Sequence, residues 1–238
     1  MPEEAAVERA LGLVSEAERR GVALRMVGGA AIFHLCGGAA SRHGDLDFVV
    51  GPKDRGAVET MFEDEGYLAD REFNHLHGHK RLYFEAPDGL PIDLFMGRMD
   101  MCHDLDLRGR LQRYSPTIPP ADLVLSKLQI VEFTDKDHED TRALLERLEV
   151  DDRDDALDTR RLQEVTCSDW GWHQTVSTNL ERFTDEDDIA GSRARTLLGL
   201  MREWPKTRRW SARARVGTRK RWYRLPQEVA HGSAAGGV

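Results

Sequence analysis

Two carboxylates that stand two residues apart are the side chains of this chain best placed to do chemistry. Asp45 and Asp47 lie in a run that continues as Phe-Val-Val, the pattern of a buried strand. Because successive strand side chains point to opposite faces, both carboxylates project from one face while Leu46 and Phe48 enter the core. Carboxylate oxygens are ligands that Mg²⁺ prefers. The spacing therefore predicts a Mg²⁺ site, and phosphoryl transfer is chemistry that such a site serves.

A glycine pair stands upstream of these carboxylates. Gly28 and Gly29 separate a short apolar strand, Leu24–Val27, from an apolar helix, Ala30–Cys36. A tight turn there needs permissive φ and ψ angles and lets backbone N–H groups approach a triphosphate. A Gly-Gly pair is usually just a turn, and an Asp-x-Asp is usually a solvated strand end. Their order here, strand, Gly-Gly, helix, loop, Asp-x-Asp and apolar strand, is far more restrictive and predicts a functional site.

This order resembles the nucleotidyltransferase superfamily related to DNA polymerase beta. The resemblance implies an NTP substrate, two Mg²⁺ ions and a third acidic residue on a later strand, for which Asp93 is the candidate. Asp93 lies within the apolar run Leu90–Met96, where a charge is costly unless it is paired or bound to a metal. The alternative for Asp93 is a carboxylate at a strand end near the surface.

More of the chain, from about Leu24 to Leu148, is similar to the AbiEii-type branch of that superfamily, the toxins of bacterial toxin–antitoxin and phage-defence systems. Arg42, upstream of Asp45, and Lys127, in a helical region, fit that branch, as does Lys136-Asp137 followed by Asp140. The spacer between Gly29 and Asp45 is longer than in the minimal polymerase-beta pattern. The resemblance implies triphosphate contacts by Gly28, Gly29, Arg42 and Lys127.

Several of these residues have a second interpretation. Lys127 lies on an apolar helical face, where lysines commonly extend to solvent. Arg42 is either a phosphate clamp or a charge partner of Asp45. Asp137 and Asp140 either hold Lys127 or Arg42, serve the metal or act as base, or decorate a helix face.

The expected reaction moves an NMP group from an NTP to an acceptor hydroxyl and releases pyrophosphate. The resemblance favours RNA, such as a tRNA 3′ end, or a protein side chain as acceptor, and it implies an antitoxin protein as a partner. One alternative is an antibiotic nucleotidyltransferase of the aminoglycoside or lincosamide kind. Another is a catalytically silent member that binds nucleotide or a partner protein.

Composition sets the class of protein. The chain has 238 residues, a net charge of −8 and three cysteines without metal-ligand spacing, Cys36, Cys102 and Cys167. No apolar run approaches the roughly 20 residues that span a bilayer, and the first residues form an acidic amphipathic pattern rather than a signal segment. We expect a cytoplasmic protein with no membrane partner.

The elements that must position the site follow from periodicity. We expect helices at Glu3–Arg20 and Asp54–Glu65, a strand near Tyr67–Phe73, and a hairpin of Arg81–Ala86 with Pro91–Met96 around the Asp88-Gly89 turn. The predicted fold class is α/β (α+β), a small mixed sheet with flanking helices and a helical C-terminal region. The predicted domains are a catalytic core at 1–118, a helical domain at 119–201 and a basic segment at 202–238.

Two further motifs are weaker candidates. His75, His77 and His79 alternate, so on a strand all three would face one way and could bind a transition metal. Because Gly78 suggests a turn, we favour a polar edge that contacts nucleotide or acceptor. The second Asp-x-Asp, at Asp104 and Asp106, lacks a preceding Gly-Gly turn, so we assign it no metal.

The charge of the chain is unevenly distributed. Residues 202–238 carry ten Lys or Arg and two Glu, a net charge of +8, which leaves −16 on the remaining residues. Trp204, Trp210, Trp222 and Tyr223 are interleaved with these cations, a composition suited to phosphate contacts and to stacking on unpaired bases. The alternative is a C-terminal segment that docks on the protein's own acidic face.

Overall fold

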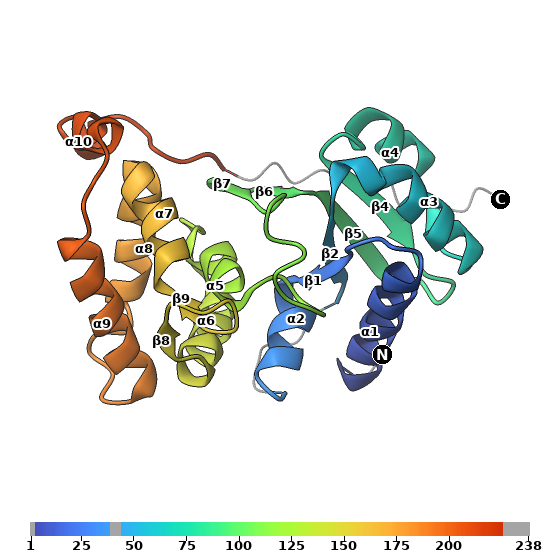
Figure 1. Ribbon diagram of the computed structural model, residues 1–238, viewed down its shortest axis with the longest axis horizontal. Helices are drawn as coiled ribbons and strands as arrows, with labels where there is room; N and C mark the ends of the chain where they lie inside the picture. The colour runs from blue at the N-terminus through green and yellow to red at the C-terminus, as the bar shows by residue number, and fades with distance from the viewer. Residues whose placement is uncertain (1–2, 39–43, 226–238) are drawn as a thin grey trace.

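A five-stranded mixed sheet forms the centre of the N-terminal half in the computed structural model, which describes residues 3–38 and 44–225 (Figure 1). In spatial order the strands are β1 (Arg25–Val27), β2 (Leu46–Val50), β5 (Pro91–Met96), β4 (Arg81–Glu85) and β3 (Leu68–Ala69). The β2 and β5 strands run parallel, and the other neighbouring pairs run antiparallel. The apolar strand residues are buried, so the sheet supplies a rigid base for the polar residues between them.

Four helices and one short 3-10 turn cover this sheet. They are α1 (Glu3–Arg19), α2 (Gly28–Leu35), η1 (Pro52–Asp54), α3 (Arg55–Asp64) and α4 (Arg71–His77). The α2 helix packs on β1 and β2, α3 packs on β3, and α4 packs on β4. Apolar faces drive this packing, as in α1, where Val7, Ala10, Leu13, Val14 and Ala17 are buried.

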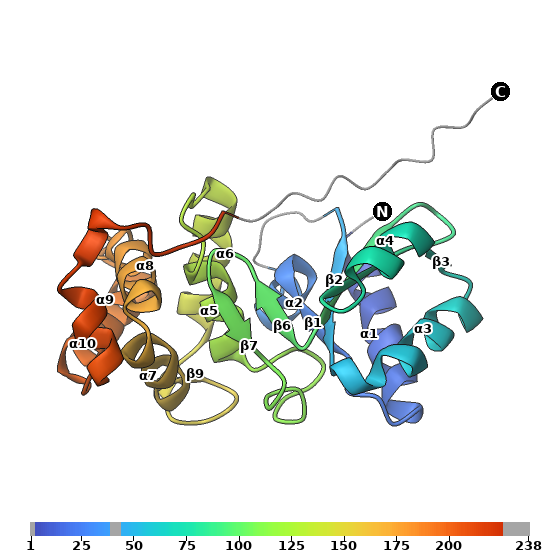
Figure 2. The same ribbon diagram turned by 90° about the horizontal axis from the view of Figure 1, so that it is seen from above.

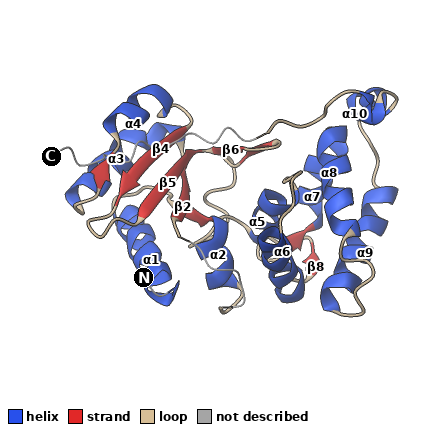
Figure 3. Ribbon diagram, turned by 180° about the vertical axis from the view of Figure 1, so that it is seen from behind, coloured by secondary structure: helices blue, strands red, loops and turns tan. Residues whose placement is uncertain are grey.

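The chain leaves the sheet through a hairpin of β6 (Arg98–Asp100) and β7 (Asp104–Asp106) and enters a helical lobe. That lobe contains α5 (Pro120–Leu128), α6 (Asp135–Arg147), α7 (Thr159–Ser168), α8 (Trp170–Glu181), α9 (Ile189–Glu203), α10 (Arg208–Ala214) and η2 (Gly217–Arg219). A two-stranded parallel ladder joins β8 (Val150–Asp151) to β9 (Leu157–Asp158). Figure 3 shows the large sheet at one side of the molecule and α7 to α10 at the other.

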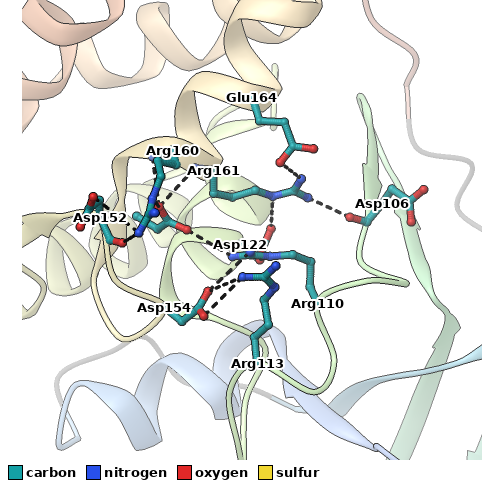
Figure 4. A network of polar contacts seen from close by, with 10 residues as sticks. Asp106, Arg110, Arg113, Asp122, Asp152, Asp154, Arg160, Arg161 and Glu164 are labelled. Carbon is teal, nitrogen blue, oxygen red and sulfur yellow. Dashed lines mark hydrogen bonds and ion pairs between the residues drawn. The ribbon is translucent and has the colours of Figure 1, made fainter.

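The helical lobe is joined to the preceding loop by a buried cluster of ion pairs, which we call the Asp122 cluster (Figure 4). Asp122 on α5 is fully buried and accepts hydrogen bonds from Arg110 and Arg161. Arg161 on α7 also donates to the Asp106 carbonyl at 2.8 Å. The cluster therefore ties α5, α7 and the β7 end together.

The predicted fold class is confirmed, and the predicted hairpin lies at β4 and β5. One element is wrong: the strand expected near Tyr67–Phe73 is only the two residues of β3, and α4 follows it. The physical reason is a helix cap, since the Asp70 carboxylate accepts a hydrogen bond from the Phe73 backbone N–H at 2.9 Å. Within the described ranges, none of the helices is long and apolar enough to cross a bilayer.

Candidate active site

The parallel pairing of β2 with β5 brings two of the predicted carboxylates together. In that register Asp47 lies opposite Asp93. Because side chains in register on neighbouring strands share a face of the sheet, both carboxylates project on the same side. Asp45 directly precedes β2 and is exposed, whereas Asp93 is 5% exposed. The sheet thus carries an open carboxylate at its edge and a buried one behind it.

Gly28 lies against this pair. The antiparallel register of β1 with β2 places Val27 opposite Asp47, so the chain leaves β1 beside the Asp47 carboxylate. Gly28 has a φ of +65°, and a Cβ added there would overlap Asp47 Oδ2 and lie 3.1 Å from its Cγ. Both the backbone angle and the close approach require glycine.

The predicted Gly-Gly turn is in fact the first turn of α2, which begins at Gly28, and Gly29 is buried within it. The prediction that the helix begins at Ala30 was therefore wrong by two residues. The first N–H groups of a helix have no intrahelical acceptor and carry the positive end of its dipole. The α2 N-terminus accordingly presents hydrogen-bond donors beside the carboxylates.

The electrostatics of the pair favour an added cation. Burial first, and then the neighbouring Asp45 and Asp93 carboxylates, raise the pKa of Asp47 to about 8 against the opposing charges of Arg81 and Lys127. The ionised form of Asp47 is thus disfavoured among the side chains present. A divalent cation reverses that balance, because it favours the charged form of each ligand.

Arg81 is a residue of this site that the sequence analysis did not identify. Its Nε and one terminal nitrogen donate to the two oxygens of Asp93 at 2.6 Å and 2.5 Å. The sequence did carry a signal, since the hairpin register pairs Arg81 with Phe95 and Tyr83 with Asp93. Arg81 therefore lies diagonally across from Asp93 on one face, within reach of a long side chain.

Lys127, on α5, is held by two carboxylates. Its ammonium group lies 2.7 Å from Asp140 and 3.5 Å from Asp137, both on α6, and its side chain is 14% exposed. Of the alternatives for Asp137 and Asp140, the structure places both on Lys127. Asp137 also forms a capping box with Thr134 at the start of α6. The ammonium group therefore has a fixed position, and its charge opposes the rise in the pKa of Asp47.

The other candidate residues lie outside the β2 and β5 strands. Arg42 is outside the described residues. The favoured polar strand edge at these histidines is wrong, as is the shared strand face of the metal alternative, because His75 and His77 are in α4 and His79 follows that helix. Residues two apart on a helix point in different directions. Asp104 and Asp106 lie on β7 and pair with Arg98 and Arg108, so the second Asp-x-Asp has cationic partners of its own.

The donor set fits magnesium. Within residues 3–38 and 44–225, no group of three or more His, Cys, Asp or Glu side chains already surrounds one cation position. Asp45 and Asp47 nevertheless supply the oxygen donors that Mg²⁺ takes, and Mg²⁺ usually keeps several waters and uses only one or two carboxylates. Asp93 can share its charge with Arg81 and with a metal, because a carboxylate has about four lone-pair sites and a forked arginine uses two of them.

No protein-family model matches the sequence, and no curated protein matches it. Among solved structures, the chain is similar to the antibiotic-resistance factor ANT(2″)-Ia, at 14% identity and a TM-score of 0.46 over 77% of this chain and 95% of that one. It is similar to the lincosamide antibiotic adenylyltransferase LnuA, at 18% identity and a TM-score of 0.40 over 54% of this chain and 89% of that one.

A third similar structure is an antigenic nucleotidyltransferase-like protein from Paracoccidioides brasiliensis, at 13% identity and a TM-score of 0.45 over 84% of this chain and 94% of that one. All three proteins bear names of nucleotidyltransferases or of an antibiotic-resistance factor.

Proposed function

We propose that the chain is a Mg²⁺-dependent nucleotidyltransferase that moves an NMP group from an NTP to an acceptor hydroxyl. One observation carries the proposal: Asp47 and Asp93 lie in register on parallel strands, with Asp45 at the strand entrance and the glycine start of a helix against Asp47. These carboxylates outnumber the cations around them and lie beside helix N–H donors. Such a site suits a substrate that brings phosphates and divalent cations together.

Each residue has a role in this proposal. Asp45, Asp47 and Asp93 hold the metal, with two ions as the expected number, and Mg²⁺ supplies Lewis-acid activation of the hydroxyl and of the leaving pyrophosphate. The N–H groups of Gly28 and Gly29 bind the phosphates, and Lys127 neutralises part of the triphosphate charge. Arg42 is proposed as a further phosphate ligand. Arg81 positions Asp93 through its two hydrogen bonds.

The acceptor defines the biological class. We propose RNA or a protein hydroxyl, the acceptors expected for a toxin of the AbiEii type, and with it an antitoxin protein and a cytoplasmic site of action. The net charge of +8 on residues 202–238 supports a polyanionic acceptor. The alternative acceptor is a small-molecule drug, whose binding does not require that basic segment.

The test uses purified protein with Mg²⁺, each α-³²P-labelled NTP in turn, and total RNA, the protein itself, or a panel of aminoglycosides and lincosamides. Label on RNA or protein is the expected result, and the NTP that gives it identifies the nucleotide. Label only on a drug would replace the toxin-type proposal with antibiotic modification. Activity that survives Asp45→Asn combined with Asp47→Asn would overturn the catalytic assignment.

A further inference from the structure

The segment from Lys206 to Arg224 has an unusual charge. It carries nine Lys or Arg residues and no Asp or Glu. Within the described part of the chain, only one of these cations forms an ion pair: Arg224 lies 2.6 Å from Asp100. Lys206 and Arg213 donate to backbone carbonyls, which leaves their positive charge in place. We call residues 206–224 the basic strap.

The basic strap is anchored by residues other than its exposed cations. The Thr207 backbone N–H donates to the Cys167 carbonyl at 3.1 Å, and the Arg213 guanidinium lies 4.7 Å from the Trp170 ring centroid. Trp222 donates its indole N–H to Thr175 at 3.1 Å and packs against Trp170. These contacts hold the backbone on α7 and α8. The strap therefore docks mainly through aromatic rings and backbone groups rather than through the acidic surface of the protein.

A set of cations remains exposed along the strap. Their common features are an exposed side chain and no ion pair with a described residue: Arg208, Arg209, Arg215, Arg219, Lys220 and Arg221. Five of the six are arginines, whose planar guanidinium groups match phosphate geometry with two parallel hydrogen bonds. Half-buried Tyr223 lies among them, with the Arg221 guanidinium 5.4 Å from its ring centroid.

The path of the strap connects this surface with the candidate active site. Figure 2 shows the segment running from α10 past α8 to the side of the β6–β7 hairpin. At its end the Arg224 backbone N–H donates to the Cys102 carbonyl, in the turn between β6 and β7. The next residue of that turn, His103, donates its backbone N–H to Gln129, two residues after Lys127. The strap thus ends beside the loop that follows the Lys127 helix.

We propose that the basic strap is an RNA-binding surface that guides a single-stranded acceptor toward the candidate active site. The role as acceptor guide rests on the proposed function, whereas RNA binding by the strap does not. The arginines that pair with no described carboxylate bind the phosphates, and Tyr223 offers a ring for base stacking. Because the chain outside the strap carries a net charge of −17, it repels RNA and confines the bound strand to the strap.

The test measures binding without catalysis, using the full chain, a fluorescein-labelled single-stranded RNA of about 20 nucleotides, EDTA and no NTP. Arg208→Gln, Arg209→Gln and Arg215→Gln are combined in one variant. We expect its Kd to rise by roughly 10- to 100-fold near 0.1 M salt, and the slope of log K against log salt to fall by about 2, because each lost phosphate contact on a single strand removes about 0.7.

The matched control removes three exposed cations elsewhere, by Arg19→Gln, Lys53→Gln and Arg71→Gln. We expect its Kd to stay within about twofold of wild type, because its charges lie off the strap. A strap variant with lysine at the same three positions should keep most of the affinity, and circular dichroism melts check that α10 still folds.

If the strap variant and the control variant lost RNA affinity equally, the effect would come from net charge and the proposal would be overturned. Unchanged RNA affinity in the strap variant would also overturn it. Binding of a poly-glutamate peptide of equal charge as tightly as RNA would overturn the choice of RNA. RNA binding that needs the strap, together with no label transfer to any acceptor, would count against the proposed function alone. Label transfer to RNA at the same rate in the strap variant as in wild type would count against the role of the strap alone.

Discussion

Two groups of carboxylates in this chain are built in opposite ways. In the Asp122 cluster, the two oxygens of a fully buried carboxylate each receive a guanidinium Nε–H, at 2.8 Å from Arg110 and 2.7 Å from Arg161. At the candidate active site, no hydrogen bond or ion pair from a described residue reaches the Asp47 carboxylate. Its neighbours Asp45 and Asp93 add negative charge instead of removing it.

The difference separates a structural role from a functional one. A buried charge with cationic partners on both oxygens is complete within the protein, and its effect is to fix the elements it joins. The site has five carboxylates, Asp45, Asp47, Asp93, Asp137 and Asp140, against the two described cations Arg81 and Lys127. Repulsion among these carboxylates destabilises the folded state, and a cation bound from solution would offset that repulsion.

The largest effect that this comparison predicts is on catalysis. Asp47→Asn should lower NMP transfer by roughly 10³-fold or more, because it removes a metal ligand worth several kcal/mol in the transition state. The same variant should unfold at an equal or higher temperature without metal, since it relieves repulsion among carboxylates. Labelled NTP transfer and thermal melts in EDTA measure both effects.

The matched control is Asp104→Asn in the second Asp-x-Asp, whose carboxylate pairs with Arg98 at 2.7 Å. We expect its transfer rate to stay within about twofold of wild type, because it lies outside the candidate active site. A loss of transfer as large as that of Asp47→Asn would show that the assay reports on folding rather than on the site.

The second prediction concerns stability in the Asp122 cluster. Asp122→Asn should lower the free energy of unfolding by about 3–5 kcal/mol, because it removes the fully buried anion that Arg110 and Arg161 share. Asp154→Asn is the control: its carboxylate lies 3.5 Å from Arg110 and Arg113 and is 38% exposed, so the loss should be under about 1 kcal/mol. Urea unfolding measures both, and equal losses would contradict the comparison.

Much of this arrangement could be predicted from local sequence. Alternation predicted β2, β4 and β5, and the Asp88-Gly89 turn predicted the hairpin of β4 with β5. In the structure that hairpin places Tyr83 opposite Asp93. The contact of Arg81 with Asp93 follows from that register. The strand wrongly expected near residue 67 failed because a single Asp70 cap and the Asn74 hydrogen bonds to Tyr83 outweigh strand propensity.

The rest depended on contacts between distant parts of the chain. Spacing alone does not place Asp47 opposite Asp93, because β2 and β5 are separated by two helices and two strands. The partners of Asp122 were likewise hidden, since Arg110 and Arg161 come from a loop and from a helix on either side of it in sequence. In both cases the burial of apolar faces sets the register, and the charged groups follow.

The third prediction tests why Gly28 is glycine. Gly28→Ala should lower transfer by about 10²-fold, because its Cβ would displace the Asp47 carboxylate and a shift of about 1 Å in a site costs this much. Gly37→Ala is a matched control, since Gly37 has a φ of +64° with nothing within 4 Å of the added Cβ. Both should lose about 1–2 kcal/mol of stability from backbone strain, yet only Gly28→Ala should lose transfer.

The smallest predicted effect is the response to magnesium itself. Mg²⁺ at ten times its Kd should stabilise the wild-type chain by about 1.4 kcal/mol, because it binds the folded site and not the unfolded chain. A thermal melt with and without Mg²⁺ measures the shift, with Ca²⁺ as a test of ion size. Asp47→Asn should abolish the shift, and Asp154→Asn should keep it, because only the first removes a carboxylate that has no ion-pair partner among the described residues. A shift of equal size in both variants would place the bound cation elsewhere on the acidic surface and would remove the distinction between the two carboxylate groups.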